Sequence, residues 1–354
     1  MTNKQVLTGA NRELFRRPPD ECFKSFDDLW KHCTQMDERS VERWILPIDF
    51  NPVPSGGTLG IEVAQQTTFN LNSWSFGQLC SYAGVSRDTI NRLSPKTAAE
   101  VFYETLPGGN KPIQVYEQGG TVRSLHPASY TRLTNTELLS VIREFATDFV
   151  PPQRAGRIEA DERTPENGTG LYCGEQDLFV FLIDPTGWIE INNEAFCPGM
   201  FVWNSEVGRR SVGIQTFWFQ AICANHIVWD ATEVVEFSRK HTANVRDALS
   251  EIRFIMHRLI LKRDARRDQF ADVLRKAMKA DLGADDEDAL KLLTRHDITK
   301  ALAKEALDIA RQNGRLTIFS VVDALTRISG NLGYIGDRTE LDAKASRLLA
   351  LASS

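Results

Sequence analysis

The spacing of apolar residues changes twice along the chain and divides it into three regions. Up to about residue 106 the apolar positions recur mainly at helical spacing, from 107 to 230 they follow strand-like patterns, and from 231 to 354 the spacing is helical again. This pattern predicts an α+β fold in which an antiparallel β-sheet core lies between N-terminal helices and a C-terminal helical region. All three regions are compatible with one compact domain.

Alternating apolar and polar residues predict the strands of the central sheet. Residues 113–125 alternate on both sides of Gly119-Gly120, as expected for a β-hairpin. The segment 171–184 ends in a continuous apolar run, which is typical of a strand covered on both faces. Two β-prone stretches flank the polar residues 204–211 and predict another hairpin, so that the sheet is expected to hold about five to seven strands.

Capping residues and helical spacing predict the surrounding helices. Ser25 precedes acidic residues in a first turn, which is typical of an N-cap residue, and a further amphipathic helix is expected to start at residues 134–137. Helical spacing without proline extends from 234 to 279, as one long helix or two, and a further helix is expected over 290–310. Residues 51–60 are rich in proline and glycine and predict a loop or a short hairpin.

Residues 78–93 allow two interpretations. A short helix, a glycine at position 84 and a second helix capped by Ser86 are the parts of a helix-turn-helix, in which Arg87, Asp88, Asn91 and Arg92 would face DNA. Any two helices joined by a short glycine turn give the same pattern. A structural helical hairpin is therefore the favoured interpretation of this segment.

Loosely spaced motifs in the central region carry a family resemblance. The polar turn 204–208 is followed by an apolar strand and by Cys223-Ala224-Asn225, and Arg123, Tyr130 and Arg132 lie in a segment that precedes a predicted helix. In these features the chain resembles the phage- and plasmid-associated proteins grouped as domain of unknown function number nine-three-two. The resemblance implies a protein of a mobile genetic element and singles out Arg123, Tyr130 and Arg132, but it implies no chemistry.

Composition and charge exclude several classes of protein. Apolar residues make up 42% of the chain, yet no apolar run approaches the roughly 20 residues needed to cross a bilayer. The net charge of −5 argues against a protein that wraps nucleic acid with its whole surface. Six cysteines without paired spacing indicate free thiols in a reducing cytoplasm, with no structural metal. We therefore expect a cytoplasmic protein without membrane insertion.

Motifs of known catalytic chemistry do not occur in the sequence. It contains no nucleophile elbow, and its glycine-rich segment at 56–60 lacks the lysine and serine of a phosphate-binding loop. Asp161, Glu162 and Glu166 lie in a polar segment in which acids are usually solvated, and His226 is a single histidine near a strand end. No catalytic residue and no cofactor are predicted, and a non-enzymatic role is expected.

Arginine and aromatic residues near the second hairpin favour nucleic-acid binding. Arg209 and Arg210 lie beside Gly208 in a turn whose backbone N–H groups can help to hold an anion. Strand alternation places Phe217 and Phe219 on one face, toward the core, and leaves Trp218 on the other face as the candidate for an exposed or a helix-covered contact. The candidate DNA-contacting residues are Arg123, Tyr130, Arg132, Asn204, Arg209, Arg210, Trp218, Arg258, Lys262 and Arg266.

The last three candidates belong to a basic segment that also has a simpler interpretation. Arg258, Lys262 and Arg266 fall on one helical stripe that can follow a phosphate backbone. Acidic residues at 264, 268 and 272 form i,i+4 pairs with neighbouring cations, as on an ordinary solvated helix face. The solvated face is slightly favoured for this segment.

Taken together, the patterns lead to one leading function and two alternatives. The leading hypothesis is a DNA-binding protein that acts on single strands during recombination, annealing or replication of a mobile element, as a monomer or a homo-oligomer. The first alternative is an anti-defence or regulatory factor that binds another protein. The second alternative is a hydrolase whose motif is unrecognised.

Overall fold

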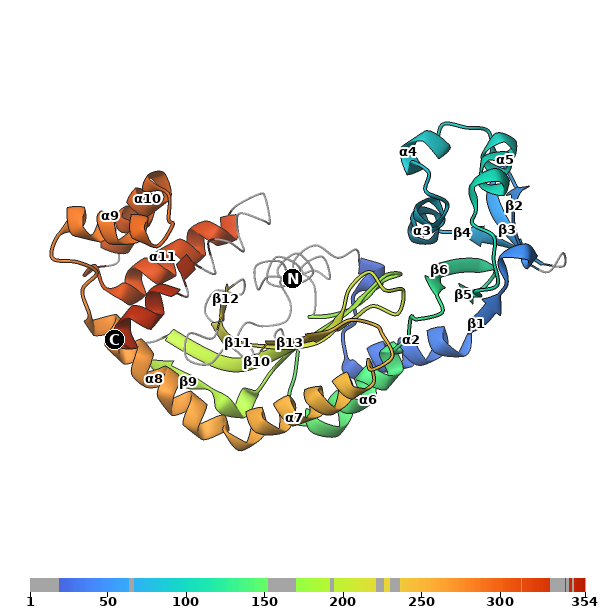
Figure 1. Ribbon diagram of the computed structural model, residues 1–354. Helices are drawn as coiled ribbons and strands as arrows, with labels where there is room; N and C mark the ends of the chain where they lie inside the picture. Colours follow the sequence, from blue (N-terminus) through green and yellow to red (C-terminus); the bar gives the residue numbers. More distant parts are fainter. Residues whose placement is uncertain are drawn as a thin grey trace.

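A computed structural model describes residues 19–63, 67–151, 170–191, 194–220, 226–229, 236–312, 314–331, 341, 344–345 and 347–353. Its described part contains two mostly antiparallel sheets with helices at both ends of the chain, which confirms the predicted α+β fold class. In Figure 1 the molecule forms an open arch. The smaller sheet with α3 to α5 lies at one end of the arch, and α9 to α11 lie at the other.

The smaller sheet has six strands in the order β1-β5-β6-β4-β3-β2, and its neighbours are antiparallel except for β4 and β6. The predicted hairpin is present as β5 and β6. Residues 40–71 form the other four strands, so the region up to residue 106 is mixed rather than mainly helical. The strands are β1 (Ser40–Ile45), β2 (Phe50–Ser55), β3 (Thr58–Val63), β4 (Thr67–Leu71), β5 (Ile113–Gln118) and β6 (Thr121–Pro127).

Helices α3 (Ser73–Ala83), α4 (Arg87–Ile90) and α5 (Pro95–Thr105) accompany the smaller sheet. Ser86 caps α4 as predicted, because its side chain accepts a hydrogen bond from the backbone N–H of Thr89. The helix is only 4 residues long, about one turn, which is too short for a recognition helix in a major groove. The structural helical hairpin is thus the better interpretation of residues 78–93.

The larger sheet is antiparallel throughout, with the order β12-β11-β10-β8-β7, while β9 pairs with β10 and β13 pairs with β11. The predicted second hairpin forms its centre as β10 and β11. Its strands are β7 (Leu171–Cys173), β8 (Leu178–Ile183), β9 (Ile189–Ile191), β10 (Glu194–Asn204), β11 (Val212–Gln220), β12 (His226–Trp229) and β13 (Glu236–Arg239).

Helices α2 (Phe26–Glu38), α6 (Asn135–Phe145) and α7 (Asp247–Leu261) cover one face of the larger sheet. The predicted N-cap and the predicted helix start at 134 are confirmed: Ser25 accepts from Asp28 at the start of α2, and Thr134 forms a capping box with Glu137 at the start of α6. Leu29, Leu138, Ile252 and apolar residues of β8 and β10 form the shared core. Figure 1 places these helices on the outer side of the arch.

The C-terminal helices are shorter than the spacing predicted. Strand β13 occupies part of the expected long helix, and the helix expected over 290–310 is divided in two. The helices are α8 (Arg263–Lys279), α9 (Asp286–Arg295), α10 (Lys300–Gln312) and α11 (Ile318–Asn331). None of the described helices is both long and apolar enough to span a bilayer.

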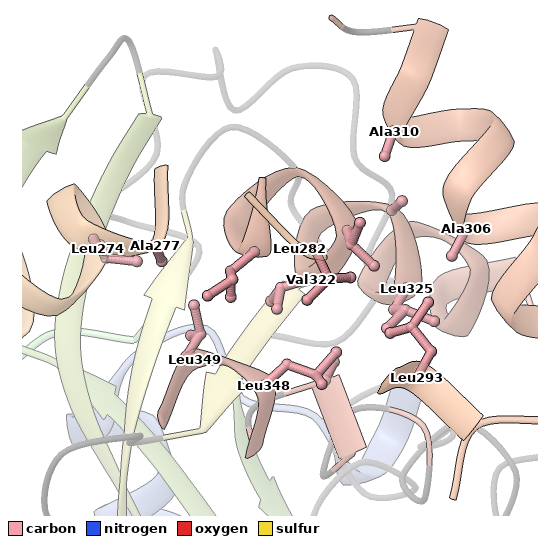
Figure 2. Close-up of a cluster of buried hydrophobic side chains, with 14 of the residues drawn as sticks. Leu274, Ala277, Leu282, Leu293, Ala306, Ala310, Val322, Leu325, Leu348 and Leu349 are labelled. Atoms are coloured by element: carbon pink, nitrogen blue, oxygen red, sulfur yellow. The ribbon is translucent and has the colours of Figure 1, made fainter. Parts of the chain in front are cut away.

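A separate hydrophobic core joins these helices to the larger sheet (Figure 2). Leu274, Leu293 and Leu325 lie in it together with Leu349 from the C-terminal end of the chain. Trp218 of β11 stacks on Phe270 of α8, with ring centroids 4.0 Å apart and 8° between the ring planes. Aromatic stacking therefore fastens α8 to the sheet.

Candidate functional site

The polar turn between β10 and β11, residues 204–210, is where the two sheets are joined, and we call it the junction turn. Its backbone oxygens accept hydrogen bonds from side chains that belong to the smaller sheet and to its helix α3. Trp74 Nε1 donates to the carbonyl oxygen of Val207 at 2.9 Å, and His126 Nε2 lies 3.0 Å from the same oxygen. Trp74 and His126 thus both contact a carbonyl group that lies more than 80 positions further along the chain.

A buried ion pair holds the centre of the junction turn. Arg123 of β6 lies 3.2 Å from the carboxylate of Glu206, and their side chains are only 7% and 5% exposed. The other carboxylate oxygen of Glu206 accepts the backbone N–H of Asn135 at 2.7 Å, and Arg123 also donates to the carbonyl of Glu175. Both charges therefore have hydrogen-bond partners, as buried charges require.

Arg132 connects the junction turn to β1 and β5. Its guanidinium donates to the carbonyl oxygen of Glu206, to Gln114 Oε1 and to the carboxylate of Glu42. It also lies over the ring of Tyr116, with 3.7 Å between the guanidinium carbon and the ring centroid. These contacts use both the N–H donors and the flat face of the guanidinium, so a lysine could not make the same set of contacts.

Three aromatic rings form a stack next to Arg132. Tyr130 stacks between His126 and His241, with centroid distances of 3.6 Å and 5.5 Å. The Tyr130 hydroxyl donates to the Glu206 carbonyl at 2.9 Å. Burial, reinforced by the charge of Arg132, lowers the pKa of His126 to about 3 and that of His241 to about 4, so both imidazoles are neutral at pH 7.

The junction turn itself is shaped to fit this cluster. Asn204, which is fully buried, donates from Nδ2 to the carbonyl of Leu133 and to Oδ1 of Asn135, both at 2.9 Å. Gly208 has a φ of +74°, and a Cβ there would lie 2.6 Å from the His126 ring. Only glycine therefore fits at this position.

These contacts correct the role expected for the residues that the family resemblance singled out. The structure brings Arg123, Tyr130, Arg132 and Asn204 together, as the sequence analysis grouped them. Their polar groups, however, point into the protein and donate hydrogen bonds to internal acceptors on Glu206, Gln114 and Leu133, so they do not present a surface to DNA. Their shared task in this structure is to join the two sheets.

Arg209 and Arg210 lie at the edge of the junction turn and share one carboxylate. Asp177, buried in the β7–β8 connection, lies 3.1 Å from Arg210 Nε and 3.7 Å from Arg209. The Arg210 guanidinium also lies over the ring of Phe179. An internal acid thus occupies the place that the sequence analysis assigned to a bound phosphate, although the Arg209 side chain remains 34% exposed.

Trp218 and Arg266 are likewise inside the protein. Trp218 was expected to make an exposed or a helix-covered contact, and the structure shows the second, because α8 covers its face of the sheet and leaves the indole completely buried. Arg266 is 7% exposed, and its guanidinium lies 3.5 Å from the Thr216 hydroxyl. Phe217 is in the core as predicted. Other residues of the sequence analysis lie outside the part that the structure describes: the side chain of Phe219, the segment 223–225, and residues 152–169 with the acids Asp161, Glu162 and Glu166.

Two further predicted contacts lie on the outer side of α7: Arg258 in the helix and Lys262, the C-cap residue that directly follows it. They are exposed and share one helical face with three other exposed residues. We call this set the α7 outer stripe: Phe254, His257, Arg258, Leu261 and Lys262. Phe254 is 56% exposed and Leu261 70% exposed, whereas Ile252 and Met256 on the opposite face are buried.

A cavity between α3 and β6 is a feature that the sequence analysis missed. It has a volume of about 680 Å³ and is lined by Trp74, Tyr82, Arg87 and His126 among others. Arg87 donates to the hydroxyl of Ser73, which also lines the cavity, at 2.7 Å. Its residues come from distant strands and helices, so no local sequence signal marks it. Within the described ranges, no group of three or more His, Cys, Asp or Glu side chains is arranged to hold a metal ion.

Removing the Glu206 carboxylate should strongly destabilise the protein. We expect Glu206→Ala to lower the free energy of unfolding by about 3–5 kcal/mol, because Arg123 stays buried without its counter-charge. Urea denaturation followed by circular dichroism measures the loss. Glu287→Ala, which breaks an exposed pair with Lys291, is the matched control and should cost less than about 1 kcal/mol. Equal losses in both variants would contradict the assigned role of the buried pair.

Acid should destabilise the fold through the buried histidines. In the unfolded chain an imidazole binds a proton near pH 6.5, whereas His241 in the folded protein stays neutral down to about pH 4. The unfolded state therefore binds more protons between these values, and stability falls as the pH decreases through this window, by about 2 kcal/mol for this residue between pH 7 and 5. His241→Phe should show a smaller decrease, measured by urea denaturation at both pH values. The exposed His257, changed to Asn, should retain the full decrease, and a similar reduction in both variants would refute the prediction.

Comparison with known proteins assigns no family to this chain. Protein-family models, curated proteins and solved structures each give no match to the chain. The resemblance to a phage- and plasmid-associated family accordingly stays a prediction.

Proposed function

We propose that the protein binds single-stranded DNA through the α7 outer stripe, as a non-enzymatic factor in the recombination or replication of a mobile element. One observation carries the proposal: exposed aromatic, apolar and cationic side chains share the outer face of a single helix. Single-strand binding combines base stacking on aromatic rings with cations that bind the phosphate backbone. The α7 outer stripe contains both kinds of side chain.

The order of residues along α7 suits this use. Phe254 precedes Arg258 by one helical turn, and the Arg258 guanidinium carbon lies 5.6 Å from the Phe254 ring centroid. Lys262 follows after a further turn, about 6 Å along the helix axis. This order supports a binding mode in which Phe254 stacks with a base while the two cations contact adjacent phosphates.

The acidic residues of the neighbouring helix α8 form ion pairs with arginines of the same helix. Asp264 and Asp268 pair with Arg267, and Asp272 pairs with Arg275. The competing interpretation, a solvated face of ion pairs, thus describes the exposed side of α8. The α7 outer stripe differs from that side of α8 because Phe254 and Leu261 expose apolar surface to solvent.

The double substitution Arg258→Ala/Lys262→Ala should weaken binding to a labelled oligodeoxythymidylate. The slope of log affinity against log salt should become shallower by roughly 0.7 for each phosphate that the variant no longer neutralises. Phe254→Ala should lower affinity about fivefold or more because a base can no longer stack there, with the salt slope unchanged. Fluorescence anisotropy over a salt series measures both effects.

The matched control is Arg295→Ala/Lys304→Ala, which removes the same charges from exposed positions on α9 and α10. It should leave affinity and slope near the wild-type values. A wild-type protein that does not bind at low salt would end the proposal. Equally weakened binding in the control and the stripe variant would contradict the proposal, because it would show that DNA responds to net charge and not to the α7 outer stripe.

Protein binding is a second candidate function, favoured by an apolar patch at the edge of the smaller sheet. Val41 and Trp44 of β1 and the following Leu46 and Ile48 are exposed, Ile48 by 81%. The opposite edge strand, β2, contains two prolines that lack a backbone donor, whereas β1 contains none. Strand β1 is therefore the edge that can accept another strand, and a second copy of the chain is the partner that we propose.

This candidate predicts self-association that depends on the apolar patch. Light scattering after size-exclusion chromatography should show a dimer for the wild-type protein and a monomer for Trp44→Glu/Ile48→Glu. Tyr103→Glu, which removes an aromatic ring that is 80% exposed on α5, is the control and should leave the dimer intact. A monomeric wild-type protein at high concentration would exclude this partner.

A further inference from the structure

Two cysteines far apart in the sequence meet beneath α2. Cys33 lies on the buried face of α2, and Cys173 is the last residue of β7. Their sulfur atoms are 3.8 Å apart, although 140 positions separate them in the chain. Both residues are buried, with exposed fractions of 3% and 6%.

The surroundings make the two thiols unequal. Cys33 donates its S–H to the sulfur of Cys173, and this hydrogen bond holds the pKa of Cys173 below its usual range while it raises that of Cys33. His32, the neighbour of Cys33 on α2, further favours the thiolate and so also lowers the pKa of Cys173. Asn135 Nδ2 lies 3.9 Å from the same sulfur. Cys173 is thus the more nucleophilic thiol of the pair.

We propose that Cys33 and Cys173 are a redox-active pair that a peroxide converts reversibly into a disulfide between α2 and β7. The Cys173 thiolate attacks one oxygen of hydrogen peroxide, the O–O bond breaks, and the products are a sulfenic acid and, after protonation, one water molecule. Cys33 then attacks the sulfenic sulfur, the S–O bond breaks and a second water molecule leaves. Two electrons pass from the thiols to the peroxide, and a dithiol such as dithiothreitol returns them.

The geometry needs little adjustment for this reaction. A disulfide has a sulfur separation of about 2.05 Å, so the sulfurs must approach by less than about 2 Å in total. The helix on which Cys33 lies already packs against β7 and α6 through Leu29. Closure of the bond would link the first long helix of the chain covalently to the larger sheet.

The remaining described cysteines lie in different surroundings. Cys197 donates to the carbonyl oxygen of Asp184 at 2.7 Å, and burial raises the pKa of its thiol. Cys80 belongs to the core of the smaller sheet. Cys22 packs against the opposite face of the larger sheet from Cys173, which makes it a suitable control.

Peptide mapping of the full-length protein tests the proposal. The protein is treated with hydrogen peroxide, residual thiols are blocked, and tryptic peptides are analysed by mass spectrometry without reduction. We expect one dominant cross-linked pair, Cys33 with Cys173, which dithiothreitol abolishes. The oxidised protein should have a melting temperature about 5 °C higher than the reduced one, because the bond closes a long loop.

Variants distinguish this pair from general thiol oxidation. Cys33→Ser should leave a sulfenic acid on Cys173 that dimedone labels, while Cys22→Ser should form the disulfide at the wild-type rate. Native-state alkylation of the wild-type protein, which needs no variant to fold, should modify Cys173 faster before peroxide treatment than after it. Cross-links that involve other cysteines, or oxidation of Cys173 to the sulfinic acid without a cross-link, would overturn the proposal.

Discussion

The buried ion pair between Arg123 and Glu206 is the interaction on which the arrangement of the two sheets depends. It joins β6 of the smaller sheet to the turn between β10 and β11 of the larger one. Burying two charges is costly, and here the cost is offset only because each side chain has further hydrogen bonds, to Glu175 and to the backbone of Asn135. Such a pair contributes orientation more than stability, since only one relative placement of the sheets satisfies every partner.

This constraint also determines which surfaces remain for a ligand. Arginines and aromatic residues are the usual materials of a nucleic-acid interface, but here many of them are used internally, in the junction turn and in the stacking of Trp218 on Phe270. The net charge of the chain is −5, so a surface that binds nucleic acid must be local. The α7 outer stripe and the edge strand β1 meet that condition because each exposes apolar surface.

Local features of the fold could be predicted from the sequence, whereas the site could be predicted only in part. The helix start at residues 134–137 and the hairpin around Gly119-Gly120 are encoded within a few residues, so both were correctly predicted. Strands β2 and β3 form the short hairpin that was one of the two interpretations of residues 51–60, whereas β1 and β4 were not predicted. The grouping of Arg123 with Arg132 was correct, but their burial could not be foreseen, since their partner Glu206 lies more than 70 positions further along the chain.

Asn135 connects the proposed redox pair to the junction turn. Its backbone N–H binds the carboxylate of Glu206, its Oδ1 accepts from Asn204, and its Nδ2 contacts the sulfur of Cys173. A thiolate at Cys173 is a stronger acceptor for that amide than a disulfide sulfur, so oxidation weakens one of the contacts that hold the Asn135 side chain in place. The amide also orients Asn204, which is fully buried. The chemical state of two cysteines beneath α2 is thereby coupled, through one side chain, to the turn that joins the sheets.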